Sequence, residues 1–226
     1  MTEWERIQLL LPMRFSKAEL KWRIQRSGEG NKGVWASVVP FISAQDLQAR
    51  LDAVVGAGNW WNEYRPTSDG KGLFCGITIS VAGSFVTKWD GASETDGAGN
   101  KDLDALKGGI SNSLKRAGVQ WGVARYLYNV GDLWATVVEG GAYRAQTKDK
   151  KTFYWNPPAV KGLEQTQFEA AAMAIVSAGS FERLATIAGR IDDLSKESGG
   201  LSAWEVEFLR AERKRRQEAL TLTQPA

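Results

Sequence analysis

The sequence predicts an α+β fold, in which a curved antiparallel β-meander packs on a long core helix and a C-terminal helical appendage follows. Three observations predict it. Residues 60–90 contain three strand-like segments, residues 102–129 carry an apolar repeat of helical period, and residues 159–226 are rich in alanine and helix-capping sequences. A sheet and an amphipathic helix each need a partner for their apolar face, so the first two are expected to pack together.

The long helix is predicted by an apolar stripe at steps of three or four residues. Its members are Leu103, Leu106, Ile110, Leu114, Ala117, Trp121, Ala124 and Tyr128. A second face carries cations at its ends and small residues in its middle, namely Lys107, Ser111, Lys115, Gly118, Gly122 and Arg125. A glycine inside a helix costs about 1 kcal/mol relative to alanine. Gly118 and Gly122 therefore indicate that another group approaches the helix backbone closely.

The meander is predicted from strand candidates at residues 60–65, 73–81 and 84–90. In the middle strand, Cys75, Ile77 and Ile79 alternate with small or polar residues, which is typical of a strand with one buried face. Ala82-Gly83 joins the last two strands and is a tight-hairpin signal. One apolar face is therefore expected to lie against the long helix.

The first third of the chain is expected to alternate helices and strands. A helix is predicted from Ser16, which has capping-box spacing to Glu19, through about Arg26. Another is predicted to begin at Ser43 and to stop at Gly56. The remaining segments are predicted as a short helix or strand at 3–12, a loop at 27–33 and a strand at 34–39. The loop matches G-x-G-x-x-G without a flanking strand and helix, so a dinucleotide site is not favoured.

Residues 130–160 are turn-rich, and a further hairpin is expected there with the KDKK run at 148–151 at a loop tip. After Pro157-Pro158 the composition changes, and helices are predicted near 164–178, 180–196 and 202–220. The predicted domains are therefore residues 1–158, which form the core, and residues 159–226, which form the helical segment.

Composition excludes several classes of site. The 226 residues include no histidine and one cysteine, Cys75, which removes Ser-His-Asp and Cys-His catalysis, His-ligated metals and an internal disulfide. No apolar run is long enough to cross a bilayer, and the N-terminus reads as neither signal peptide nor membrane anchor. A cytoplasmic protein without a cofactor or membrane contact is expected. Ten tryptophans and a net charge of +3 are compatible with nucleic-acid binding.

The long helix also carries a resemblance. KGGISNSLKRAGVQWGVARYLYN (107–129) resembles the K-x-x-x-x-[DN]-x-L-K-R-A…G helix of the Rad52/22 family of single-strand annealing proteins, in its phage and bacterial form. LKWR (20–23), VPFISAQDLQARLDAVVGAGNW (39–60) and GLFCGITISVAGSFVTKWDGA (72–92) are similar to further segments of that family. The resemblance covers about residues 9–130.

The resemblance implies a β-β-β-α core that assembles into rings or helical filaments. It implies that single-stranded DNA lies in a basic groove between sheet and helix, and that complementary strands are annealed there without ATP or enzymatic catalysis. Lys115 and Arg116 match the basic pair of that groove, and Arg23 matches a cation from the first helix. Lys107 matches a lysine of an outer contact strip.

Two departures from the family pattern are visible. Val119 stands where an arginine is usual, and Arg125, one repeat further along the face, could replace the missing cation. The long partner-binding tail of the eukaryotic members has no counterpart, which argues against a recombinase-loading role and leaves annealing untouched. The expected partners are single-stranded DNA, the annealed duplex intermediate and further copies of the chain. A host single-strand-binding protein is a possible partner of the C-terminal helices.

Alternatives remain open from the residues themselves. An acidic cluster could hold Mg²⁺ in a metal-dependent nuclease, and it consists of Asp90, Glu94, Asp96, Asp102 and Asp104. A structural nucleic-acid-binding scaffold is a third possibility. Strand aromatics could stack on bases or fill the core, namely Trp35, Trp60, Trp61, Tyr64 and Trp89. The cations of the helix, and those at 210–216, could equally be solvated surface charges.

Overall fold

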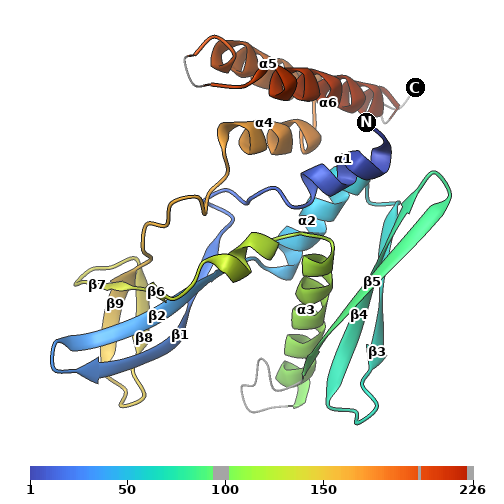
Figure 1. Ribbon diagram of the computed structural model, residues 1–226. Coiled ribbons are helices and arrows are strands. Elements are labelled where there is room, and N and C mark those ends of the chain that lie inside the picture. Colours follow the sequence, from blue (N-terminus) through green and yellow to red (C-terminus); the bar gives the residue numbers. More distant parts are fainter. Residues whose placement is uncertain (94–101, 198–199, 223–226) are drawn as a thin grey trace.

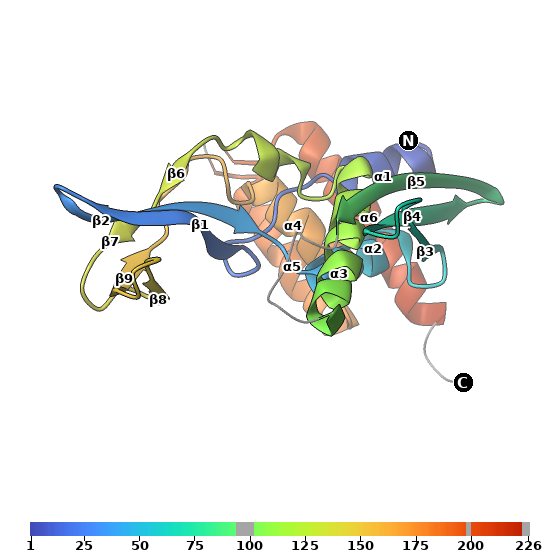
Figure 2. The same cartoon turned by 90° about the horizontal axis from the view of Figure 1, so that it is seen from below.

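The computed structural model describes residues 1–93, 102–197 and 200–222, and for residues 102–106 it describes the backbone alone. Within them the chain forms six α-helices, a 3₁₀ helix and three small antiparallel sheets, which confirms the predicted α+β class. Figure 1 shows α3 beside the β3–β5 sheet, with the β1–β2 hairpin on the other side of the helix. Figure 2 shows that this hairpin extends away from the helices.

The predicted meander is present and packs on the long helix. On β4, Cys75, Ile77 and Ile79 are fully buried, because this face of the sheet lies against the core. Helix α3 packs on β4 and β5. The elements are β3 (Trp60–Pro66), β4 (Gly72–Val81), β5 (Ser84–Ser93) and α3 (Asp102–Gln120).

The turn between β4 and β5 has the predicted geometry. Ala82 and Gly83 both have positive φ, 49° and 80°, which is the backbone of a type I′ hairpin turn. Ser84 then pairs directly with Val81. The hairpin prediction at these residues is confirmed.

The helix predicted over residues 16–26 is wrong. The carboxylate of Glu19 does accept from the Ser16 amide and hydroxyl, at 2.7 and 2.6 Å, but these bonds close only one turn. Strand β1 (Lys21–Gly30) follows and pairs with β2 (Gly33–Phe41) across a two-residue turn, so the loop predicted at 27–33 is the end of a hairpin. The short β6 (Leu133–Trp134) adds a third strand beside β2.

A third sheet supports this hairpin from one side. Ala36 and Val38 of β2 form a small buried cluster with Phe153 and Trp155 of that sheet. The KDKK run lies at the tip of its β8–β9 hairpin, as predicted, and Lys151 forms an ion pair with Glu29 near the tip of β1. The strands are β7 (Thr136–Val137), β8 (Tyr143–Gln146) and β9 (Thr152–Asn156), in the order β7-β9-β8.

Helix α2 (Ala44–Val55) begins where it was predicted. The Ser43 hydroxyl accepts from the Asp46 amide, and the Asp46 carboxylate accepts from Ser43, which completes a capping box. The N-terminal segment predicted as helix or strand is helix α1 (Glu3–Leu10), capped by Thr2. Both helices contribute to the main core.

Helix α3 ends at Gln120, earlier than the predicted Asn129, and the two glycines have separate roles. Gly122 has φ +94° and closes a Schellman motif, because the Val123 amide donates to the Gly118 carbonyl at 3.1 Å. Gly118 lies against α2, where a Cβ would come within 2.6 Å of Leu47 Cδ1. The chain continues as the 3₁₀ helix η2 (Arg125–Asn129).

Three helices follow the third sheet, as predicted, and they share the main core with the N-terminal part. Phe168, Ile175 and Leu209 are buried in the same cluster as Ile7 and Leu47. Figure 1 shows these helices stacked above α1. They are α4 (Gln167–Val176), α5 (Phe181–Leu194) and α6 (Ala203–Leu222). The domain boundary at residue 158 stays a prediction.

A buried ion pair joins the first and last helices. The Arg6 guanidinium contacts both oxygens of the Glu212 carboxylate, at 2.8 to 2.9 Å, and Glu212 is 1% exposed. Arg6 also donates to the Val54 carbonyl at 2.8 Å. Burial opposes the charge, but the hydrogen bonds and charge of Glu212 raise the pKa of Arg6. Across the described ranges, no helix is both long and apolar enough to cross a lipid bilayer.

Candidate functional site

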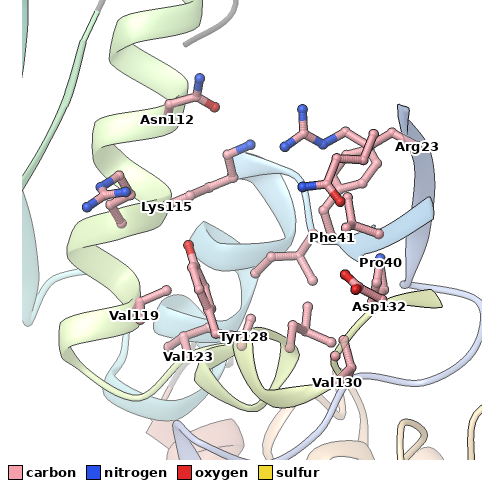
Figure 3. A pocket seen from close by; sticks show the side chains of 17 residues that line it. Arg23, Pro40, Phe41, Asn112, Lys115, Val119, Val123, Tyr128, Val130 and Asp132 are labelled. Atoms are coloured by element: carbon pink, nitrogen blue, oxygen red, sulfur yellow. The ribbon is translucent and has the colours of Figure 1, made fainter. Parts of the chain in front are cut away.

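A groove of about 730 Å³ lies between the β1–β2 hairpin and α3. Three cations line it, Arg23 from β1 and Lys115 and Arg116 from α3. Its walls also contain apolar and polar side chains, among them Val39, Phe41, Val119, Val123, Tyr128 and Asp132. Figure 3 shows how the hairpin and the helix present these groups to one another. The groove therefore brings together three of the five predicted DNA contacts.

Lys115 and Arg23 reach the groove from opposite sides. In Figure 3, the Lys115 side chain extends from α3 toward Arg23 and Phe41, and its ammonium nitrogen lies 5.8 Å from the centre of the Phe41 ring. Burial and the positive charge of Arg23 lower the pKa of Lys115. Neither cation forms an ion pair with any residue that the structure describes. The groove therefore contains two neighbouring positive charges that no acidic side chain of the described residues pairs with, although Asp132 also lines it.

Arg23 stands on a strand rather than on the predicted first helix. It faces the groove because Arg23 pairs with Val39, which also lines the groove. Paired residues of an antiparallel ladder point to the same face of the sheet. The predicted helix is therefore wrong, but the strand still places Arg23 at the groove, and its contact with DNA stays a prediction.

Arg116 is partly neutralised by an acid. Its Nε donates to Asp90 at 3.1 Å, and the Gln120 amide donates to the other Asp90 oxygen at 2.8 Å. Burial acts against ionisation of Asp90, but hydrogen bonds from Gln120, the Gly91 amide and Arg116 lower the pKa of its carboxyl. Arg116 is thus held in place on the helix and carries less free charge than Lys115.

Arg125 lies at the C-terminal end of α3 and does not line the groove. Its guanidinium donates to the carbonyls of Val119 and Gln120 at 2.7 to 2.9 Å. Lys88 of β5 donates to the Gln120 carbonyl at 3.1 Å and lies 4.4 Å from the centre of the Trp121 ring. Cations are favourable at this end of a helix, where the backbone carbonyls lack partners.

Sequence reasoning missed Lys88. Burial and the charge of Arg125 lower its pKa, so the two cations form one cluster at the end of α3. The alternation of side chains along β5 could have identified it, because that alternation places Lys88 on the same face as Asp90, toward the helix.

Lys107 is exposed on α3 and lies outside the groove. Lys115 lies eight positions further along the chain, which corresponds to about 12 Å along the helix axis. Its assignment to an outer contact strip stays a prediction.

The acidic cluster that the nuclease alternative would use to hold a metal is only partly within the described residues. Asp90 is engaged by Arg116 and Gln120, as above. Glu94 and Asp96 lie outside the described residues, and the side chains of Asp102 and Asp104 are not described. In the part of the chain whose side chains are placed, no group of three or more Cys, Asp or Glu residues could hold a metal ion.

The basic C-terminal stretch makes contacts within the protein. Arg215 forms an ion pair with Glu3 at 2.6 Å, and Arg216 donates to the Ala178 carbonyl at 2.7 Å. Arg210 pairs with Asp192 at 3.6 Å. These contacts account for three of the five cations of that stretch.

Comparison with known proteins gives one family and two relatives. The family described as "Rad52/22 family double-strand break repair protein" matches residues 3–141. The single-stranded DNA-binding protein DdrA of Deinococcus deserti is 31% identical over 106 residues, which cover 44% of this chain and 46% of that protein. DdrA of Deinococcus radiodurans is 31% identical over 100 residues, which cover 44% and 45%. The match spans less than half the length of these curated relatives.

Proposed function

This chain belongs to the Rad52/22 family of double-strand break repair proteins, and from that premise we propose that it binds single-stranded DNA and anneals complementary strands without ATP. The two DdrA relatives are single-stranded DNA-binding proteins, which supports the first half of the proposal. The proposed binding site is the groove between β1–β2 and α3.

One observation carries the assignment of the site. Arg23 and Lys115 face each other across the groove, close enough that the charge of Arg23 lowers the pKa of Lys115. A phosphate between them would relieve this repulsion and would gain two charge-assisted hydrogen bonds. Contacts of this kind grip the DNA backbone without reading sequence, and they leave the base edges free to pair.

The other predicted contacts have lesser roles in this proposal. Arg116 adds a positive charge beside Lys115, which its ion pair with Asp90 partly neutralises. Lys107 contacts DNA outside the groove. Arg125 remains a predicted DNA contact, and its hydrogen bonds to Val119 and Gln120 favour a positioning role at the end of α3. The valine at position 119 contributes an apolar part of the groove wall.

We further propose that the protein works as a homo-oligomer, a ring or a filament. Trp61, Phe74 and Phe85 are 41 to 64% exposed on the face of the β3–β5 sheet that points away from α3. Large exposed apolar patches of this kind are typical of protein interfaces. A host single-strand-binding protein remains a predicted partner of α4–α6.

The test is an annealing assay with two complementary fluorescent oligonucleotides and no ATP. The wild type is expected to accelerate pairing, and the Lys115→Ala and Arg23→Ala variants are expected to lose most of this activity. For single strands, each lost phosphate contact also reduces the salt slope of binding by about 0.7. Arg144→Ala is the matched control, because Arg144 is also an exposed strand arginine with no ion pair among the described residues.

Two results would count against the proposal. Unchanged annealing in Lys115→Ala together with Arg23→Ala would remove the groove as the site. Strand cleavage in the presence of Mg²⁺ would favour the nuclease instead, especially if Asp90→Ala abolished cleavage while leaving the fold intact.

A further inference from the structure

Two exposed tryptophans form a pair on the sheet that contains the β1–β2 hairpin. Trp35 of β2 is 41% exposed and Trp134 of β6 is 57% exposed. Their ring centres lie 5.9 Å apart with an angle of 66° between the planes, an edge-to-face arrangement. We call this pair the indole platform.

The indole platform lies on the same face of the sheet as the groove. Side chains alternate along a strand, so Trp35, Ser37 and Val39 of β2 share one face, and Val39 lines the groove. Trp134 pairs directly with Ser37 and therefore shares that face. Val39 lies four positions after Trp35, which corresponds to about 13 Å along the strand.

The platform is preorganised by the residues around it. Gly28 pairs with Trp35, and the indole lies flat on its backbone, because a Cβ at Gly28 would come within 2.8 Å of the ring. On the opposite face of the hairpin, Ala36 and Val38 are buried against the third sheet. Binding to such a platform would cost little ordering entropy.

Positive charge accompanies the aromatic rings. Arg26 pairs with Ser37 and so points to the same face as Trp134. It is exposed, and it lacks an ion-pair partner in the described part of the chain. Lys32 occupies the turn at the end of the hairpin and is likewise exposed. Cations beside exposed aromatic faces are the combination by which proteins hold single strands.

We propose that the indole platform stacks nucleobases of the same DNA strand whose phosphates occupy the groove. The proposal rests on the proposed function and adds a second part to its site, which runs from Lys115 and Arg23 along the hairpin to Trp134 and Trp35. Stacking engages the face of a base and leaves its pairing edge free, so it is compatible with annealing.

The occupant is DNA rather than a second copy of the chain because the platform continues a cationic face. The Trp61–Phe85 pair offers a comparison, since its ring centres lie 5.8 Å apart at 61° and Trp61 is also 41% exposed. That pair belongs to the β3–β5 sheet, on the face opposite to the one that α3 covers. The chain therefore has two similar aromatic pairs, and only the Trp35–Trp134 pair lies on the face that carries the groove.

The experiment measures the affinity of the full chain for a fluorescent oligo-thymidine strand and for a strand of equal length with abasic sites. Trp35→Ala and Trp134→Ala are expected to weaken thymidine binding about ten-fold, within the range of one stacked base. Binding to the abasic strand and the salt slope are expected to stay as in the wild type. Trp35→Phe should keep most of the affinity. Tyr154→Ala is the matched control, because Tyr154 of β9 is another exposed strand aromatic, 43% exposed, and it belongs to neither proposed interface.

The outcomes separate this inference from the proposed function. A wild type that fails to bind either strand would overturn the function itself. A wild type that binds both, with Trp35→Ala and Trp134→Ala unchanged, would overturn the platform and leave the groove intact. Equal weakening on both strands, or a change in assembly size by sedimentation, would show that these tryptophans act on folding or on a subunit interface.

Discussion

Lys115 carries its charge at a position where that charge is unfavourable until an anion binds. Partial burial removes water from the ammonium group, and Arg23 adds a like charge across the groove. Phe41 compensates weakly through its ring face. A phosphate is therefore expected to raise the pKa of Lys115 on binding, and proton uptake and DNA binding become linked.

The first prediction concerns pH. Because its pKa is lowered, Lys115 loses its proton at lower pH than an ordinary lysine, so DNA affinity is expected to fall as the pH rises through that value. Lys115→Arg, whose guanidinium does not titrate, should hold its affinity to higher pH. Fluorescence anisotropy at low salt, from pH 7 to about pH 10.5, measures both profiles.

The lowered pKa of Lys115 affects folding stability in the opposite direction to DNA affinity. Between the lowered pKa and the ordinary value, the unfolded chain binds this proton more tightly, so the contribution of Lys115 to stability rises with pH. A DNA affinity that falls with rising pH, while stability stays constant or rises, would identify Lys115 as the titrating group. Coinciding profiles for wild type and Lys115→Arg would contradict the assignment.

At the scale of elements, the C-terminal end of α3 is fixed by several contacts. Gly118 lets α2 approach closely through Leu47, while Gly122 turns the chain into η2. Arg125 and Lys88 then satisfy the last carbonyls. The position of Lys115 relative to β1 follows from these contacts, since α2 connects the hairpin to the meander.

The second prediction is that Gly118→Ala destabilises the protein. Alanine favours helices over glycine by about 1 kcal/mol, but overpacking against Leu47 costs typically 1–3 kcal/mol, so a net loss is expected. Gly189→Ala in α5 is the control, because nothing lies within 4 Å of a Cβ there, and it should gain about 0.5–1 kcal/mol. Urea denaturation of the two variants gives both values. Equal effects would mean that α2 can move away.

Caps, turn residues and alternation in the sequence predicted an element correctly where its tertiary packing favours the same structure. Ser43 caps α2, Ala82-Gly83 turns the β4–β5 hairpin, and the alternation around Ile77 buries one face, all as expected. The Glu19 carboxylate does accept from Ser16, as in half of a capping box, yet β1 follows, because pairing with β2 outweighs a local helix signal.

Only some of the predicted site residues lie together in the structure. Lys115 and Arg116 were identified by their motif, and the structure brings them into one groove with Arg23. The apolar repeat continues past Trp121, and for that reason α3 was predicted too long and Arg125 was placed on the wrong element. Whether a glycine ends a helix or packs inside it depends on its backbone angles, which a helical repeat does not contain.

At the scale of the whole molecule, the first and last helices depend on each other. Arg6 and Glu212 are both buried, and each would leave an uncompensated charge without the other. Breaking a buried pair from one side typically costs 3–5 kcal/mol, whereas replacing both partners with apolar residues is often neutral.

The third prediction applies this asymmetry. Glu212→Ala is expected to lower the free energy of unfolding by about 3–5 kcal/mol, and the double variant Arg6→Leu/Glu212→Leu should recover most of that loss. Asp192→Ala, which breaks the exposed pair with Arg210, should cost about 1 kcal/mol or less. Thermal and urea unfolding measure all three. A double variant as unstable as Glu212→Ala would show that Arg6 has a further role, for instance at Val54.

The Arg6–Glu212 pair also sets an order of events during translation. Its partners are 206 positions apart in the chain, so Arg6 leaves the ribosome long before the residue that neutralises it. A contact of such separation requires a long loop to close, which carries an entropic cost. Every residue of the groove lies between these two positions. The groove residues are therefore all synthesised before the buried pair of the completed fold can form.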